Sequence, residues 1–263
     1  KDNDSISKKF GSINSINWTR IMAQITYYIY AFMKISLLNN KNDISFSVPT
    51  GNFGDAYAGY LAKSKFNIPI KKIIVATNEN DILDRFFRTG EYKKYQVKAT
   101  NSPSMDIQVA SNFERLLYDF MKQDSEKVLT LMQEFDNKNK LNISKNLNLK
   151  IKKYFSSYSI DEKKTIKTIR QTYNKHKIIL DPHTAVGFAA SLEYLKKNDE
   201  KDTVVTLATA HPIKFSNAVN KALKLEPKLP EKYKSIFDLE EKYKVLDNEY
   251  LTIKGYILKN SLN

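Results

Sequence analysis

The first clear pattern in the sequence is that of a helix with one apolar face. Between about residues 17 and 38, apolar side chains recur at spacings of three and four: Trp18, Ile21, Met22, Ile25, Ile29 and Phe32. Ser15 or Asn17 can cap its start, because a short polar side chain there accepts a hydrogen bond from first-turn amides. The pattern predicts a long helix that buries one side.

A strand, a glycine turn and a second helix follow in that order. Residues 44–48 alternate as a strand does, Thr50-Gly51-Asn52-Phe53-Gly54-Asp55 interrupts them, and residues 55–65 have a helical pattern. Two glycines at such a junction let the backbone turn its amides toward an anion, and a helix N-terminus favours a phosphate there. The segment is neither a P-loop nor a dinucleotide fingerprint, so a plain tight turn is the alternative interpretation.

The strand-and-helix unit repeats along the chain. Residues 72–77 form a nearly continuous apolar run, typical of a buried parallel strand, and Asp81 is a candidate cap for a helix that ends near Gly90. Strand character returns at residues 203–208. This alternation predicts the α/β class, with a mostly parallel open sheet and helices on both faces.

The pattern changes between the second and third of these strands. Residues 122–175 are rich in lysine and asparagine and carry helical faces, with Ser159 and Glu162 spaced as a capping box. Asp181 followed by Pro182 offers a cap and a first-turn proline for the next helix. We therefore expect a helical insertion at about 122–175 within the α/β domain, and no separate module.

Composition excludes several function classes. The 263 residues contain no cysteine, which rules out disulfides, thiolate zinc sites, iron–sulfur clusters and a cysteine nucleophile. With only three histidines, a metal centre is not expected. No run approaches about 18 uninterrupted apolar residues and no signal-peptide pattern is present, so we expect no membrane partner and a cytoplasmic location.

The formal net charge of +14 raises the question of a nucleic-acid partner. Only five basic residues are arginines, however, whereas base-reading proteins favour the arginine fork. Lysines spread through the chain are typical of a solvated surface. We expect no nucleic-acid partner, and a basic nucleic-acid-binding or scaffold protein is the alternative from a different class.

A second candidate anion site lies at the start of the first helix. Helical side chains lean toward the N-terminus, so Arg20 can reach the same helix start as Ser15 and Asn17. Together these groups would suit a phosphate or carboxylate, although a capped helix with a solvated arginine fits the spacing too. Thr209 follows a predicted strand, where open α/β sheets place ligands.

Taken together, the sequence resembles the threonine synthases. Seven segments carry the resemblance in order, and their order makes chance similarity implausible: residues 14–24, 48–55, 76–81, 104–109, 111–115, 181–185 and 209–212. The resemblance implies a pyridoxal-phosphate enzyme of fold type II, like the tryptophan synthase β subunit. It also implies a carbon–oxygen lyase acting on phosphates, which converts O-phosphohomoserine and water to threonine and phosphate in the last step of threonine biosynthesis.

The resemblance also implies roles for the residues of both candidate sites. The cofactor phosphate would be surrounded by Gly51, Asn52, Phe53, Gly54 and Asp55, and the substrate phosphate by Ser15, Asn17 and Arg20. The Thr209 hydroxyl would face the pyridine nitrogen, where a hydroxyl, unlike a carboxylate, does not favour a protonated ring. Within the same fold, a phospholyase acting on another phosphorylated amino compound is the alternative function.

One feature of the family is missing from the sequence. The cofactor-bearing lysine of the family lies in a Phe-Lys-Asp type motif, which residues 1–263 do not contain. We therefore expect no catalytic residue in this chain, which would be the C-terminal portion of the catalytic domain, with the Schiff-base lysine in a missing N-terminal segment. Besides that segment we expect a small-molecule substrate as partner, a monomer or homodimer, an exposed apolar patch and no activity in isolation.

Overall fold

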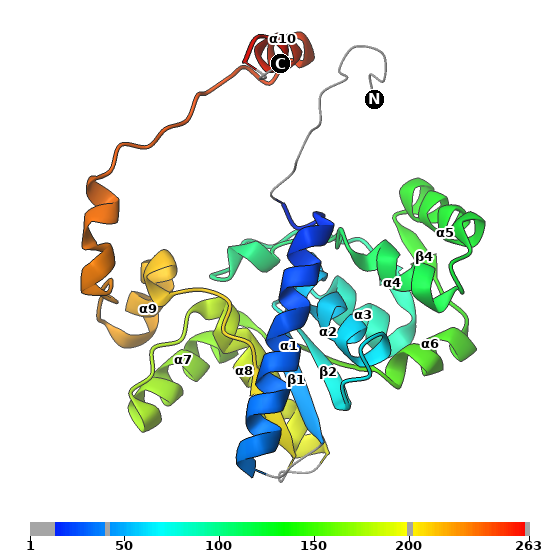
Figure 1. Cartoon of the computed structure of the whole chain (residues 1–263), viewed down its shortest axis with the longest axis horizontal. Coiled ribbons are helices and arrows are strands. Elements are labelled where there is room, and N and C mark those ends of the chain that lie inside the picture. Colours follow the sequence, from blue (N-terminus) through cyan, green and yellow to red (C-terminus); the bar gives the residue numbers. More distant parts are fainter. Residues whose placement is uncertain (1–13, 40–42, 199–201, 261–263) are drawn as a thin grey trace. The chain divides into compact units, whose positions relative to one another are not determined.

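A computed structural model describes residues 14–39, 43–198 and 202–260. The described chain belongs to two units, one formed by residues 14–228 and one that includes residues 229–260. The second unit contains a 3-10 helix, η3 (Glu231–Asp238), and α10 (Tyr250–Asn260). Every predicted site residue lies in the first unit, whose elements are drawn in Figure 1.

The core of the first unit is a parallel sheet of four strands in the order β5-β2-β1-β6. The strands are β1 (Ile44–Pro49), β2 (Ile70–Thr77), β5 (Phe155–Ser159) and β6 (Thr203–Thr206). The sequence patterns located β1, β2 and β6 to within two residues at either end. All four carboxyl ends therefore meet at one edge of the sheet.

Alternate side chains of the central strands pack into two separate cores. Ile73 and Val75 of β2 face one core, whereas Ile74 and Ala76 face the other. The first core is covered by α1 (Trp18–Asn39), α2 (Gly54–Ser64) and α3 (Ile82–Thr89). The second is covered by α8 (Pro182–Lys197), with α7 (Glu162–His176) and α9 (Ser216–Leu223) beyond it (Figure 1). The predicted α/β architecture, with helices on both faces, is confirmed.

Two parts of the predicted helical insertion are strands. Most of it is helical, in α5 (Ser125–Lys138), α6 (Lys145–Lys152) and α7, but β5 extends the parallel sheet beside β2. The sequence of β5, Phe-Ser-Ser-Tyr-Ser, has too few apolar residues to give a buried-strand pattern, and hydrogen bonding to β2 decides its conformation. A short strand, β4 (Lys140–Asn142), also pairs antiparallel with β3 (Glu91–Lys93).

The predicted capping box at the start of α7 is wrong. Asp161 caps this helix instead, and its carboxylate accepts a hydrogen bond of 2.6 Å from the Lys164 amide. The strand β5 continues through Ser159, whose hydroxyl donates to the Asn78 carbonyl at 2.9 Å. Because Ser159 belongs to β5 and α7 begins only at Glu162, Ser159 is not available as the cap of this helix.

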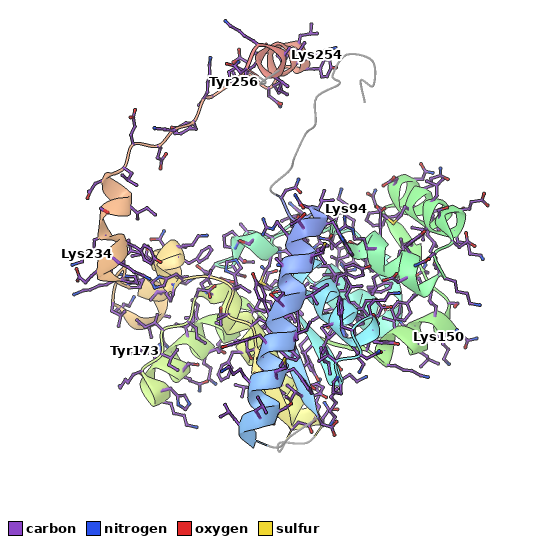
Figure 2. The ribbon with its side chains drawn as sticks, viewed as in Figure 1. Lys94, Lys150, Tyr173, Lys234, Lys254 and Tyr256 are labelled. Atoms are coloured by element: carbon purple, nitrogen blue, oxygen red, sulfur yellow. The ribbon has the colours of Figure 1, made fainter. Side chains whose placement is uncertain are left out.

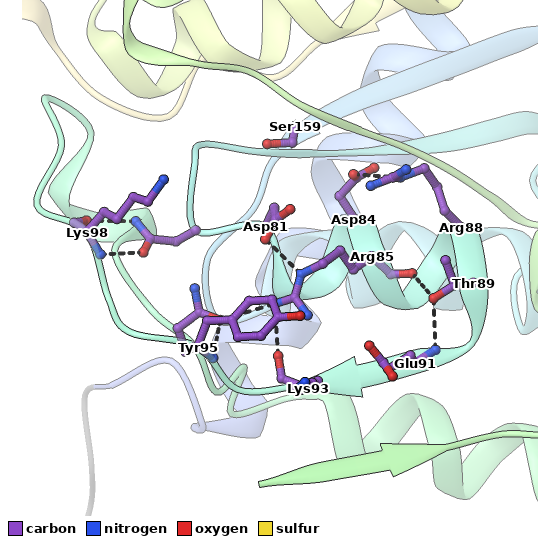
Figure 3. Close-up of polar contacts among 12 residues, drawn as sticks. Asp81, Asp84, Arg85, Arg88, Thr89, Glu91, Lys93, Tyr95, Lys98 and Ser159 are labelled. Atoms are coloured by element: carbon purple, nitrogen blue, oxygen red, sulfur yellow. Dashed lines mark hydrogen bonds and ion pairs between the residues drawn. The ribbon is translucent and has the colours of Figure 1, made fainter.

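Of the two predictions for the ends of α3, the one at Gly90 is confirmed and the one at Asp81 is wrong. Gly90 ends the helix in the left-handed conformation (φ 86°), as predicted, whereas the Asp81 side chain makes no capping hydrogen bond. The Asp81 carboxylate instead accepts from Arg85 Nε at 2.8 Å, and Arg85 also donates to the Lys93 carbonyl at 2.8 Å (Figure 3). The Arg85 guanidinium lies 4.1 Å from the Tyr95 ring centroid, so Asp81 helps to fix the segment that follows β3.

Helix α1 buries one side, as its spacing predicted. Ile21, Ile25 and Tyr28 are buried against α2 and the sheet, and the Asn17 side chain caps the helix by accepting from the Thr19 amide at 2.8 Å. Large apolar side chains also face outward: Trp18, Met22, Tyr27, Tyr30, Met33, Leu37 and Leu38. By length and composition alone, the stretch 18–38 could cross a membrane, so the cellular location stays a prediction.

The positive charge is distributed over separate elements of the first unit. Lys94, after β3, and Lys150, on α6, both project outward from different parts of the fold (Figure 2). Both side chains are exposed. These two lysines illustrate the diffuse arrangement that the composition suggested.

Candidate functional site

A cavity of about 960 Å³ opens at the carboxyl ends of β1 and β6. Its walls come from residues 49–56, from residues 207–209 and from Ser15 together with one side of α1. The edge formed by the carboxyl ends of parallel strands is where open α/β sheets bind ligands. Eight of the predicted site residues line this cavity: Ser15, Arg20, Gly51, Asn52, Phe53, Gly54, Asp55 and Thr209. The structure therefore brings the two candidate anion sites into one space.

Asn17, the ninth predicted site residue, does not line the cavity. Its side chain caps α1 by accepting from the Thr19 amide. The sequence analysis also missed Gln24, Tyr27 and Tyr30, which do line the cavity. Their spacing from Arg20 by one helical turn or more was the available signal, because residues three or four apart share a helix face.

The glycine turn is anchored in the core by an aromatic ring. Phe53 precedes α2 in the left-handed conformation (φ 64°), which non-glycine residues rarely adopt. Its side chain is only 1% exposed, and its ring centroid lies 5.7 Å from that of Phe87 and 5.8 Å from that of Phe155. The buried ring thus holds a backbone conformation that would otherwise be disfavoured.

The backbone amides of this turn are available to bind an anion. Within the described part of the chain, the amides of residues 51–55 donate to no backbone or side-chain acceptor. The first amides of any helix lack partners inside it, and they carry the positive end of the helix dipole. Since residues 51–55 also line the cavity, the arrangement suits a bound phosphate.

Gly51 is required by a close approach of two chain segments. A Cβ atom at this position would lie 2.5 Å from the carbonyl oxygen of Ser104, which precedes the end of the short 3-10 helix η1 (Pro103–Met105). No side chain can occupy that space unless the backbone shifts. The turn at residues 51–54 therefore rests directly on the loop that carries η1.

The charge state of Asp55 matters for anion binding, because an ionised carboxylate there would repel a bound phosphate. The Tyr28 hydroxyl donates to the Asp55 backbone carbonyl at 2.7 Å and to its Oδ1 at 3.1 Å. Burial raises the pKa of the Asp55 carboxyl to about 6, although the hydrogen bond from Tyr28 acts in the opposite direction. The carboxyl group thus keeps its proton over part of the mildly acidic range, which reduces its repulsion of a nearby anion.

We expect the Asp55 carboxyl to make stability fall as pH rises. Its pKa is higher in the folded chain than in the unfolded chain, so the unfolded state releases this proton first, from about pH 4, and the loss is complete above the folded pKa of about 6. Denaturant unfolding should show Asp55→Asn gaining about 1 to 2 kcal/mol relative to wild type between pH 5 and pH 8. Asp136→Asn, an exposed change on α5, is the control, and parallel pH curves for wild type and Asp55→Asn would contradict the expectation.

The start of α8 forms a second buried polar group beside the cavity. Asp181 accepts from the His183 amide at 2.9 Å and lies 3.0 Å from His183 Nδ1, and it also accepts from Thr184. Burial favours a higher pKa for the Asp181 carboxyl, but the hydrogen bonds from His183 and Thr184 outweigh it and hold this pKa below its usual range. The predicted cap with Pro182 in the first turn is confirmed.

This group also reaches two segments of the site. The Thr184 hydroxyl accepts from the Thr209 amide at 3.2 Å, and His183 Nε2 accepts from the Ser104 amide at 3.2 Å. His183 Nδ1 therefore carries the proton toward Asp181, and both ring nitrogens have partners within the fold. His211 likewise accepts from the Ile213 amide at 3.3 Å.

The described residues contain no group of three or more histidine, aspartate or glutamate side chains placed to hold a metal ion. The groups that line the cavity are backbone amides, hydroxyls, the side-chain amides of Gln24 and Asn52, one carboxyl group and the Arg20 guanidinium. Such a set binds and orients anions. Among these residues we find no amine or histidine that lines the cavity and could act as a base.

Comparisons with known proteins point in one direction. A family model described as "Threonine synthase, C-terminal" matches residues 184–257. The threonine synthase of Pseudomonas aeruginosa is 41% identical over 247 residues, covering 94% of this chain and 52% of the relative. That of Saccharomyces cerevisiae is 41% identical over 259 residues, covering 90% and 50%. The chain spans about half the length of the curated relatives it matches.

Solved structures give the same result. A threonine synthase from Brucella melitensis, solved with pyridoxal phosphate bound, is 41% identical with a TM-score of 0.85, covering 94% of this chain and 52% of that one. The yeast threonine synthase is 38% identical with a TM-score of 0.87, covering 98% and 55%. Both likenesses extend over nearly the whole chain.

Proposed function

We propose, from the premise that this chain belongs to the threonine synthase family, that it forms the part of such an enzyme that holds the cofactor phosphate and the substrate phosphate. The observation that carries the proposal concerns the backbone amides of residues 51–55, which find no acceptor among the described residues. These residues lie at the start of α2 and line a cavity together with Arg20 and Thr209. The site accommodates two anions from different sides. An enzyme acting on a phosphorylated substrate with a phosphorylated cofactor needs that arrangement.

The residues present fit pyridoxal phosphate. Gly51, Asn52, Phe53, Gly54 and Asp55 would hold its phosphate through backbone amides, and the Thr209 hydroxyl would face its ring. When bound, the cofactor supplies an electron sink for elimination and replacement at an amino-acid substrate. The chain's own contribution is to fix the cofactor's position, and to hold Thr209 through the hydrogen bond that its backbone amide donates to the Thr184 hydroxyl.

The substrate phosphate is assigned to the start of α1. The Arg20 guanidinium would pair with it, and the Ser15 hydroxyl, 3.2 Å from the Ser111 hydroxyl, would donate to it. Asn17 contributes by capping α1, which keeps this helix start in place. O-phosphohomoserine is the substrate that this assignment proposes, and a carbon–oxygen lyase acting on phosphates is the proposed enzyme class.

The lysine that carries the cofactor is assigned to the half of the relatives that this chain does not span. That half is also the proposed partner for the outer side of α1. Tyr27 and Tyr30 are 52% and 64% exposed, yet both line the cavity, so a polypeptide covering them would also close the site. We further propose a cytoplasmic enzyme that is a monomer or homodimer.

The test is to join the chain to the remaining half and to supply O-phosphohomoserine. We expect threonine and phosphate in equal amounts, dependent on pyridoxal phosphate, and no turnover by the chain alone. The same enzyme is assayed with a different phosphorylated amino compound, and turnover of that compound without turnover of O-phosphohomoserine would favour the phospholyase alternative. No product from either substrate with a folded, cofactor-loaded enzyme would refute both.

A further inference from the structure

Asn112, outside both candidate anion sites, connects them. Its side chain is completely buried, and its Nδ2 donates to the Ser15 carbonyl at 2.8 Å and to the Asn52 carbonyl at 2.9 Å. The Asn112 backbone amide also donates to the Asn52 carbonyl, at 3.1 Å. One residue, just before α4 (Phe113–Phe120), therefore binds the turn ahead of α1 and the turn ahead of α2.

Arg115 fixes the orientation of that amide group. Its Nη1 donates to Asn112 Oδ1 at 3.0 Å, which assigns the donor end of the Asn112 side chain to the two carbonyls. Its Nη2 donates to the Ile16 carbonyl at 2.8 Å, so Arg115 also binds the turn ahead of α1 directly. The Arg115 guanidinium lies 5.4 Å from the Trp18 ring centroid, which keeps its planar fork in place.

The Asn112 side chain is tightly packed against the start of α2. A Cβ atom on Gly54 would lie 3.2 Å from Asn112 Nδ2, so the side chain of Asn112 rests against the start of α2. Asn148 is the natural comparison, because it is also buried and its Nδ2 donates to the Phe86 carbonyl at 3.3 Å. Asn148 lies on α6 and does not line the cavity, whereas the acceptors of Asn112 belong to the two segments that do.

We propose that Asn112, oriented by Arg115, is a positioning residue that sets the separation between the two phosphate-binding segments. The proposal deepens the proposed function and rests on it, because the ligands of both segments are taken to be phosphates. Its consequence is specific: a change at Asn112 weakens phosphate binding at residues 51–55, although Asn112 contacts no ligand itself.

The test compares Asn112→Leu, which keeps the side-chain size without the donor, with Asn148→Leu in the same chain. Titration with inorganic phosphate, followed through backbone amide NMR signals, should show binding at residues 51–55 weakened about tenfold in Asn112→Leu, the equivalent of one lost hydrogen bond to a preorganised site. Asn148→Leu should lose stability but keep the wild-type affinity. Arg115→Lys keeps the charge but loses the fork, and should weaken binding about threefold to tenfold.

Amide hydrogen exchange tests the positioning role of Asn112 without any phosphate present. Amide hydrogen exchange at Asn17 and Thr19 should accelerate in Asn112→Leu and in Arg115→Lys, but not in Asn148→Leu. Unchanged exchange and unchanged affinity in folded Arg115→Lys and Asn112→Leu would overturn the positioning role. If wild type showed no phosphate-dependent shift at residues 51–55, the proposed function would fail, and the exchange result would still decide the role of Asn112.

Discussion

Replacing Gly51 by valine is expected to abolish anion binding at the turn before α2. The new Cβ would lie 2.5 Å from the Ser104 carbonyl oxygen, a backbone atom that cannot rotate away as a side chain can. Ser104 is itself held, because its amide donates to His183 Nε2 at 3.2 Å. The strain must therefore move the turn, which takes its amides out of the positions that face the cavity.

The cost should be visible in both stability and binding. Overpacking of this kind lowers the free energy of unfolding by about 1 to 3 kcal/mol, measured by denaturant unfolding. Calorimetric titration with pyridoxal phosphate should then show no binding by Gly51→Val. Gly255→Val on α10 is the matched control, since a Cβ there meets no atom within 4 Å and binding should be unchanged. Wild-type affinity in Gly51→Val would show that the turn is not the anion site.

Replacing Phe53 by alanine should cause the largest loss of stability in the first unit. The ring is 1% exposed and packs between Phe87 of α3 and Phe155 of β5. Truncation of a buried phenylalanine to alanine typically costs about 3 to 5 kcal/mol. The left-handed backbone at Phe53 adds to the effect, because the ring contacts that hold it would be lost.

Denaturant unfolding of Phe53→Ala measures this directly. Phe66→Ala is the control, because that ring is 55% exposed and its truncation should cost less than about 1 kcal/mol. We expect pyridoxal-phosphate affinity to fall together with stability only in Phe53→Ala. A loss at Phe53 no greater than at Phe66 would mean that the ring does not anchor the turn.

The elements that the sequence predicted well are those in which the spacing of apolar residues along the chain shows which side is buried. The alternation of apolar residues identifies β1 and the continuous apolar run identifies β2, both of which are almost entirely buried, and α1 shows its inner face at helical spacing. β5 gave no such signal, because three of its five residues are serines and its position depends on pairing with β2. The cap of α7 was misassigned for the same reason, since the end of β5 fixes where that helix begins.

The candidate site likewise has parts that could be predicted from local sequence and parts that could not. The turn at residues 51–55 was predictable, because glycines between a strand and a helix have local consequences for the backbone. The meeting of this turn with Arg20 and Thr209 in one cavity depends on sheet topology, which places the ends of β1 and β6 side by side. Asn112 could not be singled out from spacing at all, because its role exists only when three distant segments come together.

The most direct test of the central claim is to titrate this chain with pyridoxal phosphate and follow every backbone amide signal by NMR. The account predicts that the largest shifts fall on residues 51–55, with a smaller shift at Thr209, and that Gly51→Val removes them. Shifts confined to other elements, or a wild-type turn that does not respond to saturating cofactor, would contradict it.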